Sequence, residues 1–225
     1  MQAKDGYLSK RVPINFSIER ARRIQQKISK RIVTEDRLPS SLDLVAGIDV
    51  SYVGGSAVAS VAVLRYDTLE VVEVKRCRVK ERFPYVPTLL LFREAPAVFR
   101  VLPKIESKPD VYLIDAHGLA HPYRCGLANY VGVIKRIPTI GVAKSRLCGD
   151  VGEHIDDIAL LVEHGETIGV ELITKHGERP VYVSVGNMIS LSKAIEVVRH
   201  CTKNHRIPEP LRVAHKAVKE RICLS

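Results

Sequence analysis

The sequence predicts an α/β protein built on one mixed sheet that is flanked by helices. Two patterns indicate this fold class. The first apolar stretches are short, rich in Val, Ile and Ala, and joined by tight turns, which is typical of antiparallel strands. Later strand-like stretches alternate with segments whose apolar residues recur every three or four positions, as in helices packed on a sheet.

The first predicted element is a helix over residues 17–33, apolar on one side and basic on the others. The apolar positions are Ile18, Ala21, Ile24, Ile28 and Ile32. The basic positions are Arg20, Arg22, Arg23, Lys27, Lys30 and Arg31. Such a helix can pack on a sheet and offer cations to phosphates, although a solvated face is the commoner meaning of this pattern.

Three strands are predicted next, at residues 44–52, 57–66 and 69–76, with Gly54-Gly55 as the first turn. The short connections between them predict an antiparallel meander. The Pro-rich stretch 83–87 then predicts a rigid connector.

Thr88 is expected to cap a helix over residues 89–94. Pro96 is expected to break that helix, so that a second one covers residues 97–105.

The rest of the chain predicts alternating strands and helices. Strands are expected at 111–115, 139–142, 167–174 and 181–185, and helices at 125–136, 191–203 and 210–221. A three-strand antiparallel meander followed by parallel strands matches the ribonuclease H-like fold, in which acidic residues gather at neighbouring strands. One domain is expected over residues 1–225, with a basic extension and helix at 1–40 and a core at 44–215.

Composition narrows the class of protein. With 225 residues, 46% of them hydrophobic and 27% charged, the chain is typical of a globular domain. No apolar stretch has the length of a membrane span, and the N-terminus has no apolar signal region, so a cytoplasmic location without a membrane partner is expected. The five scattered cysteines predict reduced thiols rather than a zinc site or disulfides. A net charge of +10 favours a polyanionic partner such as nucleic acid, although surplus cations can also serve solubility alone.

Three carboxylates occupy the ends of different apolar elements. Asp49 lies late in the run 44–50, Glu94 follows the apolar stretch 89–93, and Asp115 ends the run 110–115. An isolated buried carboxylate is costly, and a hard divalent cation such as Mg²⁺ offsets that cost. For any one of these acids alone, a surface or capping role would be the better prediction.

Several motifs together resemble the endonuclease V family of deoxyinosine-directed nucleases, over about residues 45–215. They are Gly47-Ile48-Asp49-Val50-Ser51-Tyr52, Arg82-Phe83-Pro84-Tyr85-Val86-Pro87, Phe92-Arg93-Glu94, Asp115-Ala116-His117-Gly118 with His121-Pro122, and Gly141-Val142-Ala143-Lys144-Ser145.

The resemblance implies that Asp49, Glu94 and Asp115 hold Mg²⁺, with Mn²⁺ as a substitute ion. One-ion and two-ion sites both fit these acids. Asp110 and His121 would support or extend the metal site. The resemblance also places His215 near the metal site and Lys144 near the phosphate, so four further residues belong to the predicted site: Asp110, His121, Lys144 and His215.

The resemblance gives Lys144, His121 and His215 more specific roles. Lys144 would contact the scissile phosphate or a water as a point charge, unless it is an ordinary exposed lysine. His121 would orient a ligand or shuttle a proton, and a structural, hydrogen-bonded histidine is an equal alternative. His215 would approach the metal site from the C-terminal part of the chain.

The resemblance also implies a strand-separating wedge and a pocket for the extruded base. The wedge is Pro84, Tyr85, Val86 and Pro87, with the Tyr85 ring stacking where the base was. A stiff connector with a buried tyrosine is the alternative. Gly118, Leu119 and Ala120 are the expected pocket residues. Ala116 departs from the Gly that many relatives have after the third acid.

The function implied by the resemblance is a DNA endonuclease that recognises deoxyinosine. It would hydrolyse the second phosphodiester bond 3′ to the lesion and leave a 3′-hydroxyl and a 5′-phosphate. The alternatives are a nuclease for inosine-containing RNA or for branched DNA, and a non-catalytic nucleic-acid-binding protein. The intact acids disfavour the last of these. A monomer is expected.

Overall fold

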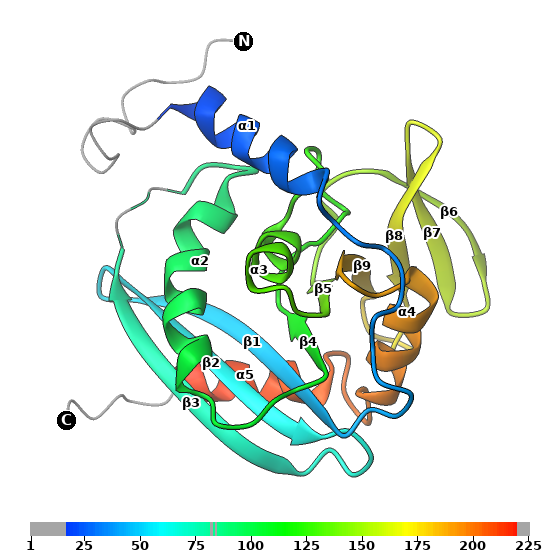
Figure 1. Cartoon of the computed structure of the whole chain (residues 1–225). Coiled ribbons are helices and arrows are strands. Elements are labelled where there is room, and N and C mark those ends of the chain that lie inside the picture. The colour runs from blue at the N-terminus through cyan, green and yellow to red at the C-terminus, as the bar shows by residue number, and fades with distance from the viewer. Residues whose placement is uncertain (1–16, 82, 84, 220–225) are drawn as a thin grey trace.

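The structure is a computed structural model that describes residues 17–81, 83 and 85–219. In these ranges the chain forms one nine-stranded mixed sheet flanked by five α-helices (Figure 1). The strand order is β3-β2-β1-β4-β5-β9-β8-β7-β6. The predicted α/β class with a ribonuclease H-like mixed sheet is confirmed.

The meander consists of β1 (Leu44–Val53), β2 (Ser56–Arg65) and β3 (Val71–Lys80), paired antiparallel in sequence order. Gly54 and Gly55 form the first turn with φ of 54° and 71°. A two-residue hairpin loop needs positive φ at both positions, which glycine adopts without strain. The turn between β1 and β2 is therefore set by local sequence.

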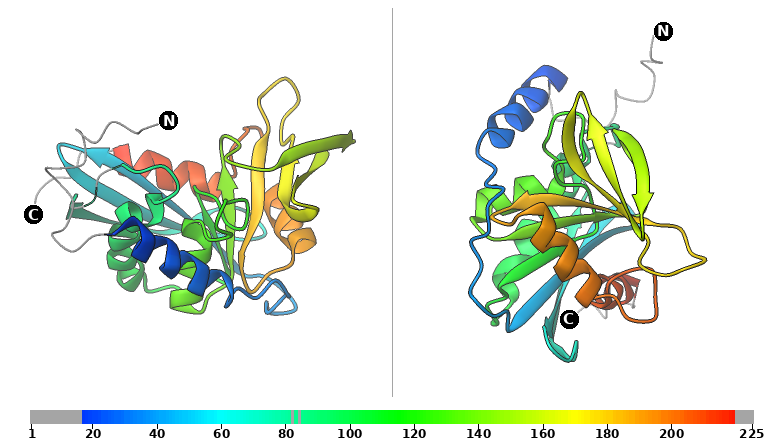
Figure 2. Two further views of the ribbon diagram at one scale, coloured as in Figure 1. Left: turned by 90° about the horizontal axis from the view of Figure 1, so that it is seen from above. Right: turned by 90° about the vertical axis from the view of Figure 1, so that its right-hand side faces the viewer.

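The middle of the sheet is parallel. β4 (Val111–Ile114) lies beside β1, and β5 (Thr139–Ala143) lies beside β4, each in parallel register. Beyond β5 every pairing is antiparallel, through β9 (Val181–Asn187), β8 (Glu166–Leu172), β7 (Ile158–Glu163) and β6 (Asp150–Ile155). Figure 2 shows this yellow-green part at the end of the sheet away from the cyan meander.

β6 and β7 were not predicted from the sequence. β6 is one of the two edge strands, and most of its side chains are exposed, so it lacks the apolar alternation by which a strand is recognised.

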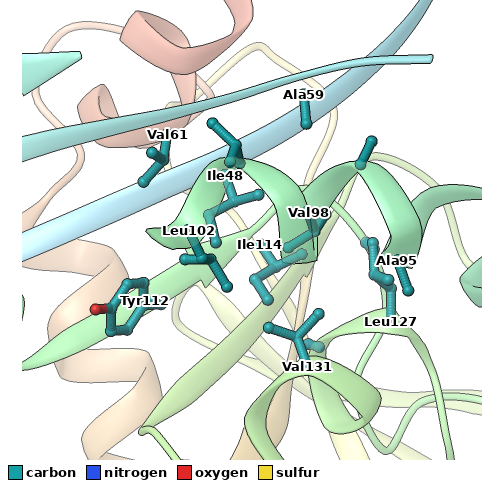
Figure 3. Packing of buried hydrophobic residues seen from close by; sticks show 14 of the residues in the cluster. Ile48, Ala59, Val61, Ala95, Val98, Leu102, Tyr112, Ile114, Leu127 and Val131 are labelled. Atoms are coloured by element: carbon teal, nitrogen blue, oxygen red, sulfur yellow. The ribbon is translucent and has the colours of Figure 1, made fainter. Parts of the chain in front are cut away.

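Helices cover both faces of the sheet. One core cluster joins β1, β2 and β4 to α2 (Leu90–Val101) and α3 (Leu127–Lys135). In Figure 3, Ile48 and Ile114 of the sheet meet Val98 and Val131 of those helices. The second cluster joins the other face to α4 (Leu191–His200) and α5 (Glu209–Lys219).

The predicted break at Pro96 was wrong, because α2 continues through it to Val101. Proline removes one backbone donor from a helix interior, and here the buried residues on either side, Ala95 and Ala97, keep the helix on the core. A short 3₁₀ turn, Leu102–Lys104, follows. The predicted cap was wrong too: Leu89 takes that position without a side-chain cap, and Thr88 has a φ of 69°.

α1 (Ile18–Ser29) begins where Ser17 accepts a hydrogen bond from the backbone N–H of Arg20. Its buried side contains Ala21, Gln25 and Ile28, and its cations face outward. The Gln25 amide donates to the carbonyls of Thr88 and Cys125, so α1 is tied to the segment before α2.

None of the described helices has the length and hydrophobicity that crossing a membrane requires. The described cysteines, Cys77, Cys125, Cys148 and Cys201, form no disulfide.

Candidate active site

Two of the predicted acids meet because their strands are parallel neighbours. β1 and β4 pair with Ile48 opposite Ile114, so the next residue on each strand is an aspartate, Asp49 and Asp115. The backbone N–H of Asp115 donates to the carbonyl of Ile48 at 3.0 Å, which continues the pairing to the acids. Parallel register therefore places both carboxylates at one edge of the sheet.

α5 and the end of β5 supply two basic groups to these acids. His215 Nδ1 lies 2.8 Å from Asp49 Oδ2, and Lys144 Nζ forms an ion pair with Asp115 Oδ2. Asp49, Asp115 and His215 each offer a ligand atom within 4.8 Å of one another. His215, predicted only as a supporting residue, thus stands in the group that could hold a metal ion.

Gly47 allows α5 to approach this closely. A Cβ on Gly47 would lie 2.1 Å from the carbonyl oxygen of Pro210, in the first turn of α5. Only glycine fits between β1 and α5 at this point, two residues before Asp49.

Glu94 reaches the cluster from α2 and is 7% exposed. The Tyr52 hydroxyl donates to Glu94 Oε1 at 3.2 Å. The guanidinium of Arg93 lies 3.9 Å from the centroid of the Tyr52 ring and also pairs with Glu81 at 2.8 Å. Glu94 is not in the compact group of Asp49, Asp115 and His215, but it lies close enough to interact with the charges of Asp49 and Asp115.

The electrostatics of the acids favour a bound cation. Burial, with the neighbouring charges of Asp49 and Asp115, raises the pKa of Glu94 to about 8, although the Tyr52 hydrogen bond opposes this. Burial also raises the pKa of Asp115 despite the adjacent Lys144 ammonium. The raised pKa values show that the neighbouring cations of the protein do not fully compensate the negative charge of these carboxylates. A group of carboxylate oxygens of this kind suits a hard divalent cation.

A cavity of about 220 Å³ begins directly beside the acids. Ala116 and His117, the two residues after Asp115, form part of its wall. Its volume is many times the roughly 10–15 Å³ that a single water needs, so it has room for a flat ring. We call it the ring-sized cavity. The other lining residues are Tyr85, Val86, Pro87, Thr88, Leu90, Leu91, His121, Gly126, Leu127, Ser145 and Leu147.

The predicted wedge lies at this cavity. Tyr85 lines it and is 66% exposed, so the alternative of a buried tyrosine is wrong. Val86 packs against the small cluster of Ala21, Phe83 and Leu89. Pro84 lies outside the described residues.

His121 is buried and uses both ring nitrogens. Nε2 lies 3.1 Å from the Thr88 carbonyl, and Nδ1 lies 3.1 Å from the backbone N–H of Tyr123. Since Nδ1 must accept from that N–H, we assign the proton to Nε2. Burial lowers the pKa of His121 to about 4, so the ring is neutral near pH 7. His121 therefore holds the cavity rim, and the predicted proton shuttle is not supported.

The predicted pocket residues Gly118, Leu119 and Ala120 do not line the cavity. The N–H groups of Gly118 and Leu119 donate to Ser184 Oγ and the Val185 carbonyl at 2.9 Å each, which fixes the loop on β9. Ala120 is buried in a separate apolar cluster. In the loop after Asp115, Ala116 and His117 are the neighbouring residues that line the cavity instead.

Asp110 does not support the metal site. Its Oδ2 accepts from the backbone N–H groups of Asp43 and Leu44 at 2.8 and 3.0 Å, at the start of β1. β4 separates Asp110 from Asp115, about 13 Å or more along an extended strand. The prediction failed because the two acids flank opposite ends of one strand.

Sequence reasoning missed three positioning residues. Tyr52 lies three residues after Asp49 inside a motif already recognised, but its contact with Glu94 spans two elements. Arg206 Nη2 donates to the carbonyls of Lys144 and Pro180, at 2.6 Å each, and so fixes the backbone of Lys144. Neither Arg206 nor Gln25 belongs to a motif that would have revealed its role.

Comparisons with known proteins agree with the family resemblance that the sequence motifs indicated. Residues 26–216 match a family model described as Endonuclease V. Endonuclease V of Thermofilum pendens is 45% identical over 206 residues, covering 91% of this chain and 89% of that protein. The crystal structure of Endonuclease V from Streptomyces avermitilis has a TM-score of 0.85 at 34% identity, covering 92% and 95% of the two chains. Endonuclease V of Ciona intestinalis, crystallised with a 24mer DNA containing an inosine followed by a ribo-adenosine, has a TM-score of 0.80 at 29% identity, covering 90% and 96%.

Proposed function

Because the chain belongs to the endonuclease V family, we propose that it is a DNA repair endonuclease that recognises deoxyinosine and hydrolyses the second phosphodiester bond 3′ to it. The reaction depends on Mg²⁺, with Mn²⁺ as a substitute, and leaves a 3′-hydroxyl and a 5′-phosphate. The protein acts as a single-domain monomer. The inosine-containing DNA bound by the Ciona intestinalis relative supports DNA as the partner.

The observation that carries this proposal is the adjacency of an acidic cluster and a ring-sized cavity. Asp115 belongs to the cluster, and the next two residues, Ala116 and His117, belong to the cavity wall. A base held in the cavity thus brings the backbone of its own strand to the acids. A cutting site a short distance from the lesion follows from this arrangement.

The cavity suits an extruded base. Its wall is largely apolar, through Leu90, Leu91 and Leu127, so it can sandwich a flat ring. Burial lowers the pKa of His117 to about 4, although a hydrogen bond to the Ser145 backbone opposes the shift. Its Nδ1 has no hydrogen-bond partner within the described chain. A neutral ring with an acceptor nitrogen favours a base that carries a ring N–H, as hypoxanthine does and adenine does not.

Asp49 and Asp115 would hold the metal ion, with Glu94 beside them. When bound, Mg²⁺ supplies Lewis acidity for the phosphate and lowers the pKa of a coordinated water. The Lys144 ammonium, already at Asp115, offers a positive charge to a phosphate oxygen. With Asp49 ionised, the His215 Nδ1–H donates to Asp49 Oδ2 and holds that carboxylate in place.

Inosine-containing RNA is the second candidate substrate. The DNA bound by the Ciona intestinalis relative carries a ribo-adenosine after the inosine, so that relative accommodates a 2′-hydroxyl there. A non-catalytic binding protein is the weaker alternative, because the acids converge as a metal-binding group.

The test is cleavage of an end-labelled duplex with one deoxyinosine, beside its undamaged twin, with Mg²⁺ and with EDTA. A single nick at the second bond 3′ to the inosine, absent with EDTA, supports the proposal. Cleavage of only the matching inosine RNA would move the function to RNA processing. Binding without any cleavage would favour the non-catalytic alternative.

Tyr85→Ala is expected to weaken discrimination between inosine and adenine duplexes about 10-fold, because stacking of one base on an aromatic ring contributes about 1–3 kcal/mol. Tyr85 is exposed at the cavity, so its removal should leave the fold intact. The measurement is the ratio of cleavage rates on the two substrates under limiting enzyme. Tyr85→Phe keeps the ring and should keep the ratio. Unchanged discrimination in Tyr85→Ala would refute the wedge.

A further inference from the structure

A second cleft, of about 470 Å³, also opens from the acidic cluster. Lys144 and His215 line its inner end, and these are the residues that contact Asp115 and Asp49. It shares no lining residue with the ring-sized cavity. The acids therefore stand between two separate openings.

The second cleft is basic along its length. Arg212, Lys216 and Lys219 lie on the same side of α5 as His215, within one turn of it on either side. Arg212 is paired with Glu209 at 2.6 Å, but Lys216 and Lys219 are exposed. No ion pair of either lysine is found within the described residues.

The floor of the cleft is apolar, formed by Ile207 and Leu211, and its lining within the described chain contains no carboxylate. A cationic rim over an apolar floor suits a sugar–phosphate backbone, whose phosphates seek the cations while the sugars pack below. From Arg212 to Lys219 the helix rises about 10 Å, which matches about three base-pair steps measured along the duplex axis.

We propose that this α5 cleft binds the phosphates of the cut DNA strand on the side of the scissile bond away from the lesion. The inference rests on the proposed function, which seats the base in the first cavity and the scissile phosphate at the acids. The strand must then continue past Lys144 and His215, and the α5 cleft begins at those residues. Lys216 and Lys219 hold that segment, so they determine affinity and product retention rather than the chemical step.

The test is the double variant Lys216→Gln/Lys219→Gln, which leaves Lys144 and His215 in place. Its matched control is Lys175→Gln/Lys193→Gln, which removes the same charge from lysines paired with Glu178 and Glu196. Binding of an inosine duplex is measured by fluorescence anisotropy over a salt series. The slope of log affinity against log salt should fall by about 1.8 in the double variant, at about 0.9 for each phosphate that is no longer neutralised, and stay unchanged in the control.

A second measurement locates the bound segment on the DNA. The duplex is shortened stepwise on the 3′ side of the cutting position. Wild-type protein should lose affinity as the first three nucleotides there are removed, whereas the double variant should be insensitive to them. Cleavage at saturating enzyme should proceed at the wild-type rate in the control variant Lys175→Gln/Lys193→Gln.

Equal slopes in the double variant and the control, or equal sensitivity to shortening in wild type and double variant, would overturn the proposal. A slope change seen on inosine RNA but not on DNA would overturn its assignment to DNA. Both binding readouts work without cleavage. A protein that binds as expected but never cuts would refute the proposed function and leave the α5 cleft supported.

Discussion

Asp49→Asn and Asp115→Asn are each expected to lower the cleavage rate by at least about 10³-fold, because a lost metal ligand removes several kcal/mol of transition-state stabilisation. Asparagine keeps the shape and one acceptor oxygen, so the interactions with His215 and Lys144 are weakened in charge but not in geometry. Binding of the DNA should largely persist, since the cations of the α5 cleft are untouched. Single-turnover cleavage and anisotropy separate the two effects.

Asp110→Asn is the matched control, because it makes the same change at the other end of β4. Its carboxylate only caps the start of β1, so cleavage should stay at the wild-type rate. Metal binding adds a readout independent of activity: Mn²⁺ titration should show weakened binding in Asp49→Asn and Asp115→Asn alone. Wild-type cleavage by either of these two variants would show that the metal site lies elsewhere.

Gly47→Ala is expected to destabilise the protein by about 3 kcal/mol, at the upper end of the usual overpacking cost. The new Cβ would lie 2.1 Å from the Pro210 carbonyl oxygen, so α5 must move away from β1. For a chain of this size the melting temperature should fall by about 6–12 °C. Since α5 also holds His215 against Asp49, Mn²⁺ affinity should fall together with stability.

Gly152→Ala is the control for this prediction. Gly152 also lies in a strand, but a Cβ there would meet only the Leu160 carbonyl oxygen at 3.6 Å, an ordinary van der Waals distance. Its unfolding free energy should change by less than about 0.5 kcal/mol. Thermal unfolding followed by circular dichroism measures both variants. A melting temperature of Gly47→Ala equal to that of Gly152→Ala would show that α5 does not depend on close packing at Gly47.

The sequence by itself determined most of the elements and the acids. Period-two and period-3.6 apolar patterns placed the meander, the central strands and the five α-helices, because those patterns report burial of a strand face or a helix side. They missed β6, where exposure removes the pattern, and also β7, and they divided α2 at Pro96, where packing outweighs one lost hydrogen bond. Resemblance of motifs pointed to Asp49, Glu94 and Asp115, because the residues that mark each motif lie next to the acid in the sequence.

Only the tertiary structure decided which groups converge. His215 reaches Asp49 across 166 residues, and Asp110 is excluded although it is close to Asp115 in sequence. The ring-sized cavity is assembled from three separate segments, and its wall includes Ala116 and His117 but none of Gly118, Leu119 and Ala120. The α5 cleft joins Lys144, which follows β5, to α5, and α5 itself packs directly on β1 at Gly47. Local pattern sets where an element begins and ends, whereas strand order, register and helix approach fix which side chains share one volume, and those depend on residues distant in sequence.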